Sequence, residues 1–333
     1  MKTLILHIGF PKTGTTTVQT TLEKYSWYIG KYANASALQK DMRYVFRDFF
    51  GIQNTNYSEQ RNLFKELETK DQMMDNILYS DEDLVLRAPV RDGGGHFIWW
   101  PYATKQCKGQ FNIDNAPIIL GLKKIKEQPN LNIKIILSIR SQWNLIPSLY
   151  FQRSDRNLRA GQFDFDCQIE RILKDPQYFS FKSWYDSIAS IVSGENLLVL
   201  PVEIINNNSY WHQLGQFLGA ELEGCGAIPK KNSAPREGLH QNVYPIKEIR
   251  SGTLTYGVRQ LIKFSVKNKT SLTKSFLRDA RANAEIVGRI FAGYREKTFM
   301  VSDGNRDRLK ECYQEENWAL SEQIGCDLKS LGY

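Results

Sequence analysis

Near its start the chain reads Leu4-Ile5-Leu6-His7-Ile8-Gly9-Phe10-Pro11-Lys12-Thr13-Gly14-Thr15-Thr16-Thr17. The apolar run that ends at Gly9 has the length of a buried strand, and a Pro/Gly turn follows it. Beyond the threonines, Val18, Leu22 and Tyr25 recur at helical spacing and predict a helix. A strand, a glycine turn and a helix N-terminus together form an anion site, because free backbone N–H groups and the positive end of the helix dipole converge there. We therefore expect this segment to bind a phosphate-like group.

The lysine of this turn is placed differently from that of the nucleotide-triphosphatase loop, which reads G-x-x-x-x-G-K-[ST]. Here it precedes the second glycine, in the order Pro11-Lys12-Thr13-Gly14-Thr15-Thr16. This order resembles the phosphosulfate-binding loop of sulfotransferases that use 3′-phosphoadenosine 5′-phosphosulfate (PAPS), whose form is P-K-[ST]-G-T-[TS]. The resemblance implies that PAPS binds as co-substrate and leaves as PAP, held by Lys12, Thr13, Gly14, Thr15, Thr16 and Thr17. The alternative is a turn that only caps a helix in an ordinary α/β protein.

A second buried strand is expected at residues 132–140, where β-branched and apolar residues run up to Arg140. Ser148 follows eight residues later, on a segment with helical spacing. In the same sulfotransferase family, an arginine at a strand end and a serine eight residues later hold the 3′-phosphate of PAPS. The resemblance implies this role for Arg140 and Ser148. The chemistry is suitable, because a guanidinium gives a forked, always-charged clamp on a phosphate and a serine adds one donor.

Composition limits the ligands and the cellular location. The 333 residues carry a net charge of +8, which favours a polyanionic ligand such as a nucleotide or an acidic glycan. No run of lysines dominates, so we expect no nucleic-acid partner. The five cysteines are scattered and form no C-x-x-C pair, which indicates reduced thiols and no metal site. No segment has the length and apolarity of a transmembrane span or a signal sequence, so we expect a cytoplasmic protein.

The alternation of apolar strands with helical segments implies a mostly parallel sheet with right-handed crossovers. We expect an α/β protein with a three-layer, P-loop-type fold and additional C-terminal helices. The expected organisation is a single domain over residues 1–333, with a core in 1–220 and a helical extension in 221–333. A short strand is expected at residues 83–87.

Acidic and histidine residues near the strand ends are the candidates for the general base that deprotonates the acceptor. Glycan-type sulfotransferases often carry an [ST]-x-E motif in the position of Ser80-Asp81-Glu82, and several family members use a glutamate as base. The resemblance implies that Glu82 removes the proton of the acceptor. The alternatives are His96, in a glycine-rich loop, and His7, at the end of the first strand. The acidic residues could equally form a solvated turn, and His7 could be a strand-end residue that is hydrogen-bonded below the loop.

These features predict a PAPS-dependent sulfotransferase that acts on a hydroxyl of a carbohydrate or glycolipid. Lys12 and Glu82 are its expected catalytic residues, with Lys12 stabilising the oxygen that leaves. One alternative is an ATP-dependent small-molecule kinase, against which stand the missing G-K-[ST] and the presence of Arg140 where a magnesium-binding aspartate is expected. Another is a nucleotide- or glycan-binding module without catalytic activity.

Overall fold

The computed structural model describes residues 2–22, 28–30, 46, 49–50, 76–81, 83–86, 111–154, 160–222, 242–249 and 294–333. Two compact units make up the chain. The first comprises residues 1–145, 171–234 and 307–333, and the second comprises residues 146–170 and 235–306.

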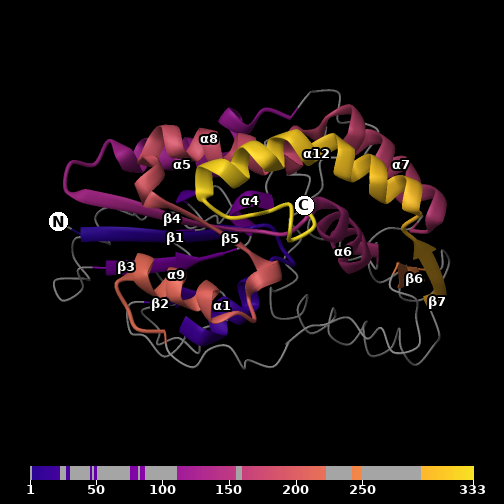
Figure 1. Ribbon diagram of the computed structural model, residues 1–333, viewed down its shortest axis with the longest axis horizontal. Helices are drawn as coiled ribbons and strands as arrows, with labels where there is room; N and C mark the ends of the chain where they lie inside the picture. Colours follow the sequence, from indigo (N-terminus) through magenta and orange to yellow (C-terminus); the bar gives the residue numbers. More distant parts are fainter. Residues whose placement is uncertain are drawn as a thin grey trace, which may run out of the picture. The chain divides into compact units, whose positions relative to one another are not determined.

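A five-stranded sheet forms the centre of the first unit (Figure 1). Its strands, in spatial order, are β2 (Tyr28–Gly30), β3 (Asn76–Ser80), β1 (Lys2–Gly9), β4 (Leu131–Ile139) and β5 (Leu197–Pro201). All four pairings are parallel. The carboxyl ends of β1, β3, β4 and β5 therefore meet at one edge, where open α/β sheets bind their ligands.

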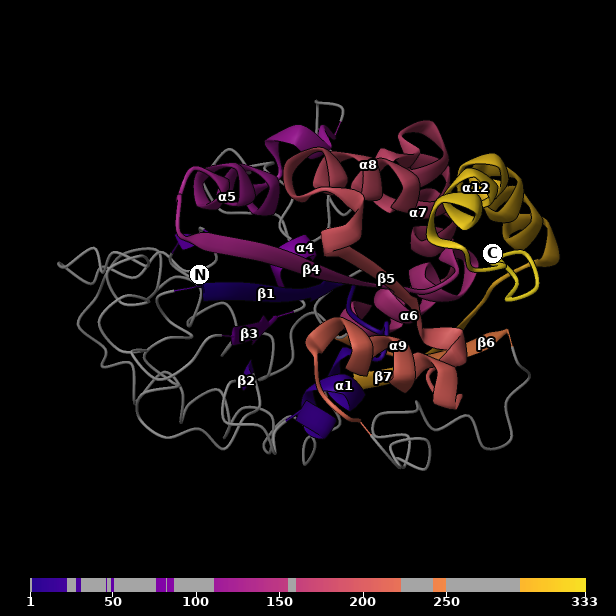
Figure 2. The same cartoon turned by 60° about the vertical axis from the view of Figure 1, so that its left-hand side comes forward.

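Helices cover both faces of this sheet (Figures 1 and 2). On one face lie α1 (Thr15–Leu22) and α9 (Asn208–Leu218), and on the other lie α5 (Pro117–Lys126) and α8 (Phe181–Val192). The buried cluster under α1 and α9 comprises Ile5, Val18, Leu22, Leu78, Ile136, Leu200, Tyr210, Trp211, Leu214, Leu218 and Leu222. Burial of both sheet faces explains the continuous apolar runs of β1 and β4. The expected three-layer α/β fold is confirmed.

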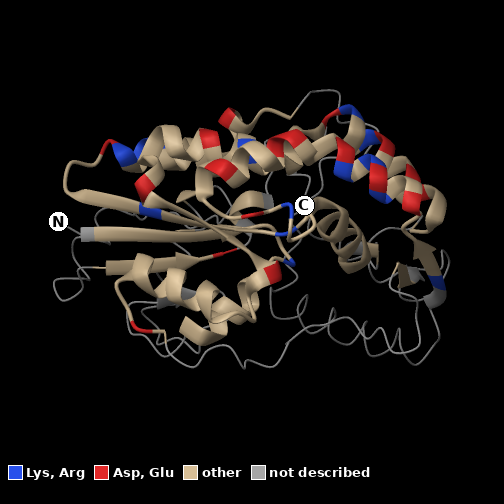
Figure 3. Ribbon diagram, in the orientation of Figure 1, with Lys and Arg blue, Asp and Glu red and all other residues tan. Residues whose placement is uncertain are grey.

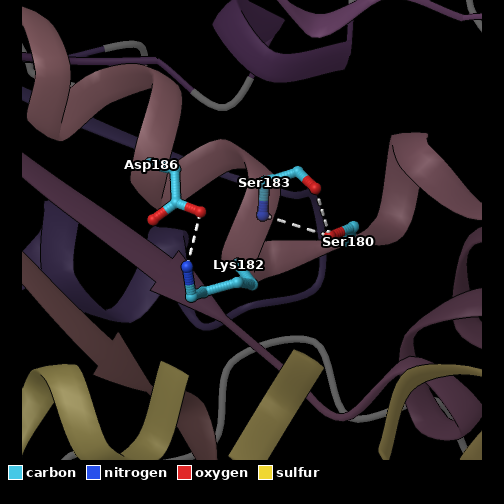
Figure 4. A network of polar contacts seen from close by, with 4 residues as sticks. All are labelled: Ser180, Lys182, Ser183 and Asp186. Atoms are coloured by element: carbon cyan, nitrogen blue, oxygen red, sulfur yellow. Dashed lines mark hydrogen bonds and ion pairs between the residues drawn. The ribbon is translucent and has the colours of Figure 1, made fainter. Parts of the chain in front are cut away.

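The start of α8 shows how polar side chains fix a helix end in this unit (Figure 4). The Ser180 hydroxyl accepts the backbone N–H of Ser183 at 3.1 Å and so caps the helix. In the first turn of the helix, Lys182 pairs with the Asp186 carboxylate at i, i+4 on the exposed side. Trp184 and Ile188 are buried on the other side of the same helix.

Helix α12 (Asp303–Ile324) belongs to the first unit from residue 307 onward. Its buried positions are Leu309, Tyr313, Asn317 and Leu320, spaced as one helical stripe. The Asn317 amide exchanges hydrogen bonds with the Gln142 amide, at 3.0 and 3.1 Å. Acidic and basic residues are interspersed along the exposed side (Figure 3). The helix carries six acidic and three basic residues, so the positive charge of the chain is not concentrated there.

The second unit has its own aromatic core. It includes helix α6 (Gln142–Ser154) from Ile146 onward and helix α7 (Gln162–Lys174) up to Glu170. An antiparallel pair, β6 (Val243–Ile249) and β7 (Tyr294–Met300), completes it. The Phe299 ring lies 4.9 Å from that of Tyr150 and 4.5 Å from that of Phe165, between ring centroids.

Two expectations about secondary structure are wrong. Residues 83–86 form a short helix, α4 (Asp83–Leu86), because the strand lies earlier, in the apolar run of β3, and Leu84 donates to the Asp81 carbonyl as the chain turns. The extension expected to be helical contains β6 and β7, where aromatic and β-branched residues favour strands.

Short 3-10 turns connect the larger elements: η1 (Ile113–Asn115), η2 (Pro176–Phe179), η3 (Gly194–Asn196) and η4 (Val202–Ile204). Among the helices of the described ranges, none combines the length and apolarity that a membrane span requires. The expectation of a single domain stays a prediction.

Candidate active site

The loop between β1 and α1 is a closed turn at the carboxyl edge of the sheet. Thr13 closes it, because its backbone N–H and its hydroxyl both donate to the Phe10 carbonyl, at 3.3 and 2.5 Å. Two loop residues have left-handed backbone conformations, Lys12 with φ of 73° and Gly14 with φ of 75°. A lysine in this conformation is strained, and such strain is found preferentially at functional sites.

Close packing explains both glycines of this loop. A Cβ on Gly14 would lie 2.7 Å from side-chain atoms of both Val202 and Ile205, which follow β5. A Cβ on Gly9 would lie 2.9 Å from the Thr13 hydroxyl and 3.0 Å from the Cβ of Ser138. The loop backbone therefore lies directly against the ends of β4 and β5.

Helix α1 begins immediately after this turn. The Gly14 carbonyl accepts the N–H groups of Thr17 and Val18, at 2.9 and 3.2 Å, and starts the helix. The first residues of a helix have N–H groups without intrahelical acceptors, and the helix dipole is positive at this end. The first turn of α1 carries no acidic residue that would oppose an anion. The expected strand, turn and helix start are therefore present at this loop, and the role of residues 13–17 in binding an anion stays a prediction.

Arg140 is brought to the same loop by β4. This strand is the parallel neighbour of β1, with Ser138 in register with Gly9, so Arg140 emerges beside the loop. Its Nη1 donates to the main-chain carbonyl of Lys12 at 3.3 Å, and both residues are half-buried. The structure therefore places Arg140 against the main chain of Lys12, just before the N-terminus of α1.

His7 lies below the loop in a buried polar network. Its Nδ1 is 2.8 Å from the Ser80 hydroxyl on β3, and its Nε2 is 2.8 Å from the Ser138 hydroxyl on β4. Burial lowers the pKa of His7 to about 4, so the imidazole is neutral at pH 7. The Gln19 amide of α1 also donates to the Ser80 hydroxyl, at 3.0 Å. These contacts support the interpretation of His7 as a hydrogen-bonded strand-end residue and not as the base.

Asp81 is a buried carboxylate that the sequence analysis did not assign. It follows β3 at the same edge of the sheet, and its Oδ2 accepts the Tyr79 hydroxyl at 2.9 Å. Its N–H donates to the His7 carbonyl at 3.2 Å. The acidic run after Ser80 was the available signal, but sequence alone does not show which carboxylate turns inward. Glu82, the expected base, and His96, its alternative, lie outside the described residues.

Ser148 is buried in α6 and belongs to the second unit, so its expected role beside Arg140 stays a prediction.

Two other residues near Arg140 were not assigned a role from the sequence. The Glu203 carboxylate follows β5 and accepts the backbone N–H of Ser141 and the hydroxyl of Tyr333. No local sequence pattern links Glu203 to Tyr333, because 130 residues separate them.

No protein-family model matches this chain, and no curated protein matches it in sequence. Solved structures that resemble it include a sulfotransferase from Alicyclobacillus acidocaldarius, at 10% identity and a TM-score of 0.39, covering 85% of this chain and 94% of that one. Mouse sulfotransferase SULT7A1 complexed with PAP has 14% identity and a TM-score of 0.37, covering 93% and 89%. The sulfotransferase domain of the Synechococcus PCC 7002 olefin synthase has 11% identity and a TM-score of 0.33, covering 86% and 94%.

Proposed function

We propose that this chain is a PAPS-dependent sulfotransferase that moves a sulfuryl group to a hydroxyl of a carbohydrate or glycolipid. The observation that carries the proposal is the contact of Arg140 with the loop carbonyl of Lys12. An anion loop with the order P-K-T-G-T-T and a second cation at the neighbouring strand end fit a donor with two separate phosphate positions. PAPS is such a donor, with a 5′-phosphosulfate and a 3′-phosphate.

The loop residues fit the 5′-phosphosulfate. In this proposal it is held by the N–H groups of Gly14, Thr15 and Thr16, by the hydroxyls of Thr15, Thr16 and Thr17 and by the ammonium of Lys12. Thr13, expected to bind the donor directly, instead closes the loop, because its N–H and hydroxyl both donate to the Phe10 carbonyl. Arg140 and Ser148 hold the 3′-phosphate, which distinguishes PAPS from ATP. The close packing of Gly14 on Val202 and Ile205 supports this assignment, because the loop backbone is held in a fixed shape. A preformed set of donors stabilises an anion at little reorganisation cost.

The transfer requires two roles besides donor binding. An oxygen of the acceptor forms a bond to sulfur, while the bond between sulfur and the bridging phosphate oxygen breaks. Lys12 stabilises the negative charge that develops on that leaving oxygen. Glu82 accepts the proton of the acceptor hydroxyl, and PAP leaves with the electron pair of the broken bond. Positioning and electrostatics carry most of the rate, by analogy with phosphoryl transfer.

The carbohydrate or glycolipid acceptor is proposed from the [ST]-x-E order of Ser80-Asp81-Glu82 and from the basic character of the chain. A net charge of +8 favours acidic acceptors as well as an anionic donor.

The test is a transfer assay in which the purified protein is incubated with PAPS and a panel of glycan and glycolipid acceptors. Acceptor-dependent release of PAP, with a sulfated product detected by mass spectrometry, is the expected result. Acceptor-dependent consumption of ATP with a phosphorylated product would instead establish the kinase. Donor binding without turnover across a panel of sugar, steroid and phenolic hydroxyls would support a non-catalytic binding module.

A further inference from the structure

Both carboxylate oxygens of Glu203 are held by hydrogen-bond donors. Oε1 accepts the backbone N–H of Ser141 at 3.0 Å, and Oε2 accepts the hydroxyl of Tyr333 at 2.7 Å. Ser141 and Tyr333 are buried, and Glu203 is half-buried. Hydrogen bonds to an ionised carboxylate are among the stronger ones in proteins, so this arrangement fixes all three groups.

The contact with Ser141 reaches Arg140 through one peptide plane. The N–H of Ser141 belongs to the rigid peptide unit that begins at Cα of Arg140, so holding this N–H restricts the backbone of Arg140. The Ser141 carbonyl in turn accepts the N–H groups of Asn144 and Leu145, at 2.9 and 2.8 Å, and starts α6. Glu203 therefore fixes the short junction from which the Arg140 side chain projects toward Lys12.

Tyr333 is itself anchored on several sides. Its N–H donates to the Leu328 carbonyl at 3.1 Å, and its ring lies edge-on to Phe181. The preceding carbonyl, that of Gly332, accepts the indole N–H of Trp143 at 2.8 Å. Burial raises the pKa of Tyr333 well above 10, with a further contribution from the charge of Glu203, so the hydroxyl keeps its proton at neutral pH. The positive charge of Arg140 opposes this shift.

A carboxylate at the edge where the donor binds has an electrostatic cost, because it repels the donor phosphates and attracts the Arg140 guanidinium away from them. Two donors on its oxygens disperse that charge and leave the guanidinium directed at the loop. The bonded Glu203 thus stabilises the junction that carries Arg140.

We propose that Glu203 and Tyr333 are positioning residues that orient Arg140 and thereby set the affinity of the site for the 3′-phosphate of the donor. This inference rests on the proposed function, because it requires Arg140 to bind that phosphate. Neither residue is expected to contact the sulfuryl group. Their loss should therefore change donor discrimination and the KM for PAPS, while kcat at saturating PAPS is retained.

The experiment compares the dissociation constants of adenosine 3′,5′-bisphosphate and adenosine 5′-phosphate by titration calorimetry. The wild-type chain should prefer the bisphosphate. Tyr333→Phe should reduce this preference at least about fivefold by weakening bisphosphate binding, with the monophosphate affinity changed by less than about twofold. Glu203→Ala should have the same effect. Glu203→Gln should keep most of the preference, because an amide can accept from Ser141 and donate to the rotated Tyr333 hydroxyl.

Ser330→Ala is the matched control, since it also removes a hydroxyl from the C-terminal segment. This hydroxyl donates to the main-chain carbonyl of the exposed Asp327. It should leave the preference unchanged. A Tyr333→Phe variant that melts earlier but keeps the wild-type preference would show a structural role only and overturn the inference. Tyr333→Phe tests the positioning role even where Glu203→Ala fails to fold. A wild-type chain that binds both nucleotides equally would overturn the proposed donor, and the inference with it.

Discussion

The Arg140 guanidinium donates from Nη1 to the main-chain carbonyl of Lys12, 3.3 Å away. One residue follows β4 and the other lies in the loop after β1, so the contact joins two neighbouring parallel strands at their carboxyl ends. A carbonyl acceptor on the guanidinium orients the fork without neutralising its charge. The guanidinium thus keeps its positive charge beside the loop.

This arrangement predicts which nucleotide stabilises the protein. Adenosine 3′,5′-bisphosphate should raise Tm strongly, because a ligand at a hundred times its dissociation constant adds about 2.7 kcal/mol to the free energy of unfolding. ATP with magnesium should raise it much less, since it offers no 3′-phosphate to Arg140. Thermal unfolding with each nucleotide at equal concentration measures the difference. An equal or larger shift with ATP would favour the kinase.

Substitutions at the two cations should separate binding from catalysis. Arg140→Ala should raise the KM for PAPS about 10- to 100-fold with kcat nearly unchanged, because it removes a charged clamp that acts equally in ground and transition states. Lys12→Ala should also lower kcat, by about 100- to 1,000-fold, because the ammonium acts on the leaving oxygen.

The control for these variants is Lys134→Ala. Lys134 is a cation on β4, the strand that Arg140 follows, but its Nζ donates to the Phe217 carbonyl. Its loss should leave the KM for PAPS unchanged. Unaltered donor affinity in Arg140→Ala would show that the assignment of the second motif is wrong.

The sequence predicted the strand, turn and helix around Lys12 well because the information is local. The three elements adjoin one another between residues 4 and 22, and each has its own residue pattern. Strands β4 and β5 could also be predicted from their apolar runs, since strands buried on both faces are continuously hydrophobic. Parallel pairing of β4 with β1 brings Arg140 beside the loop.

Contacts between distant segments were beyond this reasoning. The bond from Tyr333 to Glu203 joins residues far apart in sequence, and neither residue type predicts a partner by itself. The short helix α4 was mistaken for a strand because Leu84-Val85-Leu86 is apolar in either conformation. The burial of Asp81 within the acidic run was also not predicted, because sequence does not show which carboxylate lies inside.

The left-handed backbone of Lys12 predicts a difference between two substitutions that both remove its charge. Glycine adopts this conformation without steric cost, whereas alanine retains a Cβ. Lys12→Gly should therefore be more stable than Lys12→Ala by about 1 kcal/mol, measured by urea denaturation. At Glu315, exposed in α12, the same pair should show the opposite order, because glycine costs about 1 kcal/mol in a helix interior. Equal stability of the two Lys12 variants would contradict the strained loop.

The buried His7 predicts a loss of stability in acid. Its pKa is about 4 in the folded chain and 6.5 in the unfolded chain, so between pH 6.5 and pH 4 mainly the unfolded chain binds the proton. The free energy of unfolding should therefore fall by about 3 kcal/mol between pH 6.5 and pH 4 from this group, and no further below pH 4. His7→Gln lacks this titration, so the wild-type minus variant difference isolates it from the carboxylates. A difference that stays constant with pH would contradict the neutral, bonded imidazole.

The identity of the base gives the last prediction. Glu82→Gln keeps the size of the side chain but cannot accept the acceptor's proton, so kcat should fall by about 100- to 10,000-fold while donor affinity is retained. His96→Gln is the control and should remain active.

Asp81→Asn tests the neighbouring carboxylate. Because Asp81 is buried and accepts the Tyr79 hydroxyl, its replacement should chiefly lower Tm. If Glu82→Gln stays active while folded Asp81→Asn is inactive, the base is the buried aspartate; if only His96→Gln is inactive, it is the histidine. The donor assignment is unaffected by either outcome, since it depends on the loop and Arg140.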